Sequence, residues 1–126
     1  MTLKECLNHI LNISELNRQF FKEKQLAIES DNKDAFHTNI EYLVAYNHIW
    51  DLTKKWLEEY DMSSPDAETA IIKTLFYEYA NRDFSDVHQT VLFEVFNVIT
   101  HRNHLVPYKL TEFDESGWRR CVLKTD

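Results

Sequence analysis

Six histidines interspersed with carboxylates are the residues of this chain most suited to chemistry, so a metal site is the first hypothesis to test. His37 and Glu41 lie four residues apart, which places them on one face of a predicted helix. His101, on a later predicted helix, is the third candidate ligand. The Glu-x-x-His spacing that a di-iron bundle uses is absent from the predicted helices. We therefore expect no cofactor. A helical metal-binding protein that uses His37, Glu41 and His101 remains a second alternative.

The segment from residue 82 to residue 88 reads RDFSDVH, an arginine followed by polar residues and a histidine. This pattern resembles the motif of HEPN-type ribonucleases, which are all-helical domains of about this size. The resemblance implies metal-independent RNA cleavage at a dimer interface, with Arg82 stabilising the phosphate and His88 transferring a proton. A local role is equally compatible with the residues, because Ser85 caps a helix and His88 falls in its first turn. The ribonuclease is the main enzymatic alternative.

Glycine occurs once in the 126 residues, at Gly117, and this scarcity removes most loop-based active sites. A P-loop, a nucleophile elbow and a dinucleotide-binding turn all need glycines where the backbone bends sharply or approaches a ligand. Cys6 and Cys121 lie at opposite ends of the sequence and match neither a zinc nor a redox motif. We therefore expect a protein without enzymatic activity.

Aromatic side chains alternate with carboxylates between residues 46 and 61, and this combination suits a protein-binding surface. Aromatic residues supply contact area, and acidic residues steer a basic partner during encounter. The predicted partner-binding residues are Tyr46, Trp50, Asp51, Trp56, Glu58, Glu59, Tyr60 and Asp61.

The net charge of −7 fits the same hypothesis, because a negative body attracts a basic protein surface. No basic stripe follows any predicted helix, so direct binding of nucleic acid is not expected. The profile is similar to that of immunity proteins, antitoxins and phage anti-defence proteins, which are small, acidic and helical. This resemblance of class implies an inhibitor that occludes a basic functional surface of its partner. A homodimer is compatible with it.

The elements that position these residues are predicted from helical spacing of apolar residues over long stretches without glycine or proline. We expect one all-α domain, an antiparallel bundle of about four helices with a short C-terminal appendage. The predicted helices span residues 3–29, 32–61, 65–81 and 85–102, and the tail spans 105–126. Within the tail, Thr111 is expected to begin a short helix that Gly117 interrupts.

The start of the sequence lacks the charged segment and long apolar run of a signal peptide, and no stretch is apolar enough to span a membrane. We therefore expect a cytoplasmic protein. Cys6 lies within an apolar helical stripe, which predicts a buried thiol. Near the end of the second helix, Lys54 and Lys55 precede Glu58 and Glu59 by four residues, a spacing that predicts ion pairs.

Overall fold

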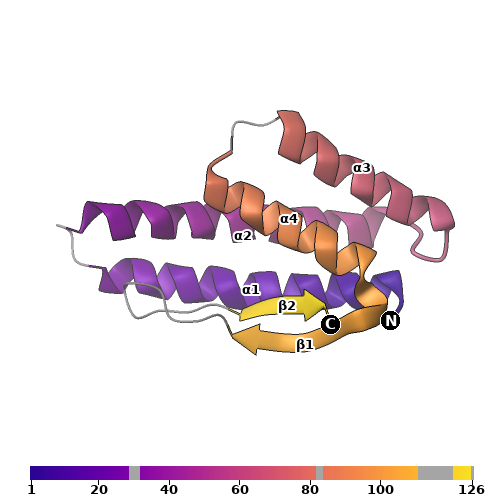
Figure 1. Ribbon diagram of the computed structural model, residues 1–126, viewed down its shortest axis with the longest axis horizontal. Helices are drawn as coiled ribbons and strands as arrows, with labels where there is room; N and C mark the ends of the chain where they lie inside the picture. Colours follow the sequence, from indigo (N-terminus) through magenta and orange to yellow (C-terminus); the bar gives the residue numbers. More distant parts are fainter. Residues whose placement is uncertain (29–31, 82–83, 111–120, 126) are drawn as a thin grey trace.

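The computed structural model describes residues 1–28, 32–81, 84–110 and 121–125 of the chain. Its four α-helices are α1 (Leu3–Ala27), α2 (Lys33–Glu59), α3 (Pro65–Asn81) and α4 (Asp86–Thr100). Each begins and ends within two residues of its expected bounds. Successive helices run in opposite directions (Figure 1), which confirms the predicted antiparallel four-helix bundle.

Side-chain caps explain where the helices begin. The Thr2 hydroxyl accepts a hydrogen bond from the Glu5 backbone N–H at 3.1 Å, and the Ser85 hydroxyl accepts one from the His88 N–H at 3.2 Å. Asn32 does the same for α2 through the N–H of Ala35. Each cap satisfies a backbone donor that has no partner inside its own helix. Ser85 therefore caps its helix as predicted, and Thr2 and Asn32 act in the same way.

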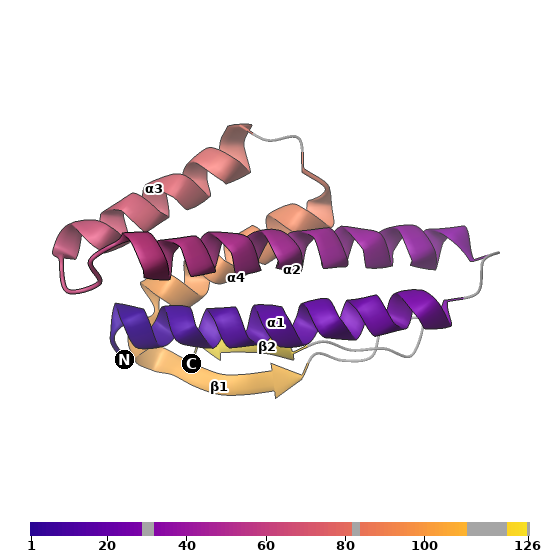
Figure 2. The same cartoon turned by 180° about the vertical axis from the view of Figure 1, so that it is seen from behind.

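The core lies where α1 and α2 pack along each other and α4 crosses them. In Figure 1, α4 lies in front of α2, and Figure 2 shows α3 diverging from α2 toward its carboxyl end. The Cys6 thiol is fully buried and donates to the carbonyl oxygen of Val98 at 3.8 Å, which ties α1 to α4. The most deeply buried aliphatic side chains are Leu7, Ile49, Ile71, Val91, Leu92 and Ile99.

Helix α2 has two apolar stripes, and only one of them enters the core. Ala45, Tyr46, Ile49 and Trp56 are buried, whereas Phe36, Ile40 and Val44 form an exposed stripe at four-residue steps. The exposed stripe belongs to the half of α2 that extends beyond the crossing with α4 (Figure 1). Among the helices of the described ranges, none is both long enough and apolar enough to cross a bilayer.

The C-terminal appendage contains strands, which the sequence analysis did not predict. A 3₁₀ turn (η1, Arg102–His104) leads into β1 (Leu105–Leu110), which pairs antiparallel with β2 (Cys121–Thr125) beside α1 (Figure 1). The register shifts between Val106 and Lys109, the interval that contains Pro107. Proline lacks the N–H that a ladder needs, so an irregularity at this point is expected. The short helix predicted from Thr111 to Gly117 lies outside the described residues.

Candidate functional site

The predicted partner-binding residues divide into a buried, a half-buried and an exposed group. Tyr46 and Trp56 are 3% and 2% exposed, so the prediction that they lie on a binding surface is wrong. Their helical position turns them toward the core, and Tyr46 stacks on Phe21 with ring centroids 5.9 Å apart. Core and interface aromatics have the same composition, so the sequence could not separate them.

Trp50, a predicted aromatic anchor, is half-buried, and two cations flank it. The Arg18 guanidinium carbon lies 4.1 Å from the centroid of the indole ring, and the Lys54 nitrogen lies 4.8 Å from it. Such contacts are attractive because the ring face carries partial negative charge. Lys54 is thereby directed toward Trp50, and it forms no ion pair with Glu58 in the described part of the chain. The predicted pairing of these two residues is wrong.

Four exposed carboxylates gather toward the carboxyl end of α2. We call this set the acidic end, and it consists of Asp51, Glu58, Glu59 and Asp61. Within the described residues, Asp51, Glu58 and Glu59 have no ion-pair partner, and the last turn of α2 contains no basic residue. The Ser63 hydroxyl and backbone N–H donate to Asp61 and lower the pKa of its carboxyl, which keeps the group ionised. Tyr60, half-buried, packs against the core beside them.

The acidic end is electrostatically unfavourable in the isolated chain. The last turn of a helix presents unpaired carbonyl groups and carries about half a negative charge, which favours cations. Glu58 and Glu59 are the final two residues of α2, so their charges oppose this field. Each such placement costs about 0.3–1 kcal/mol at low ionic strength. The bundle therefore retains a local cost at this surface that a basic ligand would relieve.

A cluster of His48, Glu78, Phe84 and His88 connects α2, α3 and α4. His48 Nδ1 and His88 Nε2 lie 2.8 Å apart, and the Glu78 carboxylate is 3.8 Å from the other nitrogen of His48. Phe84 stacks on the His88 ring at 3.8 Å. Burial, followed by the nearby charge of His48, lowers the pKa of His88 to about 4. The sequence analysis missed the pairing because forty residues separate the two histidines.

This cluster weakens the ribonuclease alternative. His88 is 4% exposed and covered by Phe84, so its imidazole is not available to an RNA substrate, contrary to the role that the resemblance implied. Its backbone N–H is bonded to Ser85, as the local interpretation predicted. Arg82 lies outside the described residues.

The metal-site alternative also lacks an assembled ligand set. His37 Nε2 and the Glu41 carboxylate are 3.1 Å apart, so the two predicted ligands do meet. His101, however, is at the end of α4, and α2 begins at the opposite end of the bundle (Figures 1 and 2). There the His101 imidazole contacts the Asn97 carbonyl oxygen and the Thr100 hydroxyl. Within the described ranges, no three His, Cys, Asp or Glu side chains group closely enough to hold a metal ion.

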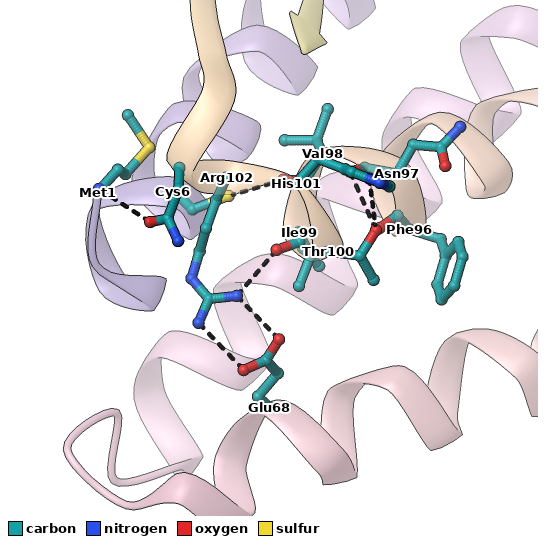
Figure 3. A network of polar contacts seen from close by, with 11 residues as sticks. Met1, Cys6, Glu68, Phe96, Asn97, Val98, Ile99, Thr100, His101 and Arg102 are labelled. Carbon is teal, nitrogen blue, oxygen red and sulfur yellow. Dashed lines mark hydrogen bonds and ion pairs between the residues drawn. The ribbon is translucent and has the colours of Figure 1, made fainter. Parts of the chain in front are cut away.

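A polar network at the end of α4 has a structural role (Figure 3). Arg102 donates to both carboxylate oxygens of Glu68, at 2.8 and 3.1 Å, and to the carbonyl oxygen of Ile99 at 2.9 Å. The Glu68 hydrogen bonds raise the pKa of Arg102 further. The network fixes the start of α3 against the end of α4. Nearby, burial raises the pKa of the Cys6 thiol to about 11, so the predicted buried thiol is confirmed.

An apolar groove between α3 and α4 is an exposed feature that the sequence analysis did not predict. It has a volume of about 120 Å³ and is lined by Leu75, Phe76, Tyr79, Leu92, Phe93 and Phe96. Phe76 and Phe93 are 55% and 53% exposed, although both pack against Phe96, with ring centroids 5.1 and 6.2 Å away. The groove is therefore a contiguous apolar patch on the surface of the described part of the chain.

Comparison of the chain with protein-family models, curated proteins and solved structures gives no match. The functional argument therefore depends on the site geometry.

Proposed function

We propose that this protein is a non-enzymatic protein-binding domain, an inhibitor that covers a basic functional surface of its partner. The observation that supports the proposal is the acidic end of α2. Its carboxylates are exposed, and Asp51, Glu58 and Glu59 have no ion-pair partner within the described residues. A basic partner would neutralise charges that the bundle itself leaves unpaired.

The binding mode follows from the chemistry of this surface. Carboxylates at the acidic end accept hydrogen bonds from arginine or lysine, so they would occupy a partner site built for phosphate or another anion. The protein's net charge of −7 increases the rate of encounter with a basic surface. Trp50 and Tyr60 are half-buried and adjoin Asp51, Glu59 and Asp61 in the sequence, and they would supply the apolar part of the contact. The inhibitor classes that fit are those expected from the sequence: immunity proteins, antitoxins and anti-defence proteins.

The test is affinity capture from a lysate of the organism that encodes the chain, at low and at moderate ionic strength. We expect the wild-type protein to retain one partner in a stoichiometric amount and to lose part of it as salt increases. The double variant Glu58→Gln/Glu59→Gln should capture at least about tenfold less, since each lost charge-assisted contact is worth about 1 kcal/mol or more.

The matched control is Asp34→Asn, which removes the same type of charge from the opposite end of α2. Asp34 is exposed and lies in the first turn, where a carboxylate is favourable. Capture by this variant should equal that of the wild type. The proposal would be rejected if the wild type retained no stoichiometric protein, or if both variants captured the partner equally well.

A further inference from the structure

The groove between α3 and α4 combines an apolar hollow with exposed aromatic rings. The hollow has a volume of about 120 Å³, and Phe76 and Phe93, both about half exposed, are among the residues that line it. An apolar cavity of about 150 Å³ in another protein takes up benzene, so this hollow is close to the size of one aromatic ring. A surface that has both a ring and a hollow of ring size can pair with a copy of itself about a two-fold axis.

The charge of the groove favours a second copy over the basic partner proposed for α2. The exposed residues one helical turn from Phe76 or Phe93 are Lys73, Tyr79, Ala80 and Thr90, of which Lys73 alone is charged. The half-buried neighbours Ile72, Gln89 and Asn97 are uncharged. Glu78, the nearest acid on α3, is directed toward His48 and away from the groove. Two molecules that each carry −7 repel least where carboxylates are absent. The groove offers such a surface, whereas the acidic end does not.

The exposed area is adequate for the centre of a dimer interface. Phe76, Tyr79 and Phe93 are about half exposed, and an aromatic side chain can bury roughly 150–250 Å², so the three offer about 300 Å² per copy. A standard interface buries about 800 Å² per partner, with an apolar centre and a polar rim. The uncharged side chains around the groove suit the rim.

We infer that the chain forms a two-fold dimer through the α3–α4 groove, with the exposed phenylalanine of one copy seated against the hollow of the other. Two copies of α3 and α4 then face each other and cover Phe76, Tyr79 and Phe93. The dimer leaves the acidic end of α2 to a different partner, so this inference and the proposed function succeed or fail independently.

The test is sedimentation velocity over a concentration series from micromolar to millimolar. The wild type should shift from monomer to dimer, and Phe93→Asp should raise the dissociation constant at least about 30-fold, the loss expected for one interface anchor. Leu26→Asp is the matched control because Leu26 is 88% exposed on α1, away from the groove. It should dimerise like the wild type.

A second variant tests the dimer without changing the aromatic cluster, so that a weaker dimer cannot be explained by misfolding of that cluster. Lys73→Glu changes an exposed side chain and leaves the core intact, so it should weaken the dimer in low salt and recover in high salt. A monomeric wild type at millimolar concentration would overturn the inference. So would a dimer that Phe93→Asp and Lys73→Glu leave unchanged, or one that Leu26→Asp disrupts.

Discussion

Acid should destabilise this protein through His88. The imidazole is buried, and its pKa is about 4 in the folded protein against 6.5 for the free side chain. As the pH falls below 6.5, the unfolded chain takes up a proton that the folded chain refuses. The free energy of unfolding therefore falls as the pH is lowered from 6.5 to 4. Neutral His88 adds its full contribution to stability only above pH 6.5.

The size of this loss follows from the two pKa values. A shift of one pKa unit corresponds to about 1.4 kcal/mol, so moving from 6.5 to about 4 gives a loss on the order of 3 kcal/mol by pH 4. A domain with a total stability of about 5–15 kcal/mol would lose a substantial share. The main structural cause is burial of the His88 ring, which penalises its charged form. The 2.8 Å contact with His48 adds to it, because charging both rings would place two cations side by side and break their hydrogen bond.

The assay is urea unfolding at several pH values from 7 to 4, comparing the wild type with His88→Phe. Phenylalanine keeps a ring against Phe84 but cannot titrate. The wild type should lose about 3 kcal/mol more than the variant over this range, since carboxylate titration is common to both. His37→Gln, at a side chain 77% exposed, should retain the wild-type pH dependence. Equal losses in the wild type and His88→Phe would refute the reasoning.

Two further predictions concern the network at the end of α4 and the buried thiol. Arg102→Met should lower the free energy of unfolding by about 1–2 kcal/mol. The loss is no larger because the Glu68 carboxylate is more than a third exposed and water screens the ion pair. Arg102→Lys should recover less than half of this loss in urea unfolding, because lysine cannot bond both carboxylate oxygens; full recovery would contradict the bidentate contact. In a Cys121→Ser background, iodoacetamide should label Cys6 far more slowly in the folded than in the urea-unfolded protein, because the thiol is buried and its pKa is about 11. Equal labelling rates would show that Cys6 is accessible.

The sequence predicted the helices because their signals are local. Thr2, Ser85 and Pro65 mark helix starts within one turn of chain, and each does so in the structure. The two strands were missed because scarcity of glycine excludes only tight hairpins. Ten residues separate β1 from β2, so this pairing needs no tight turn.

The candidate surfaces were predicted less well because they depend on contacts between distant residues. Nothing in the local pattern distinguishes Trp56, which is buried, from Phe93, which is exposed. The difference arises from the direction in which each helix packs. Likewise, His48 and His88 meet only because α4 crosses α2. Asp51, Glu58, Glu59 and Asp61 are exposed as a binding surface requires, because charged side chains are almost never fully buried.

The most direct test of the central claim measures the stability and the partner binding of Glu58→Gln/Glu59→Gln side by side. Removing two charges from the negative pole of α2 should raise the free energy of unfolding by about 0.5–2 kcal/mol. The same variant should bind the captured partner at least about tenfold more weakly. Higher stability together with weaker binding would support the claim that the acidic end binds a basic partner. Lower stability together with unchanged binding would contradict it.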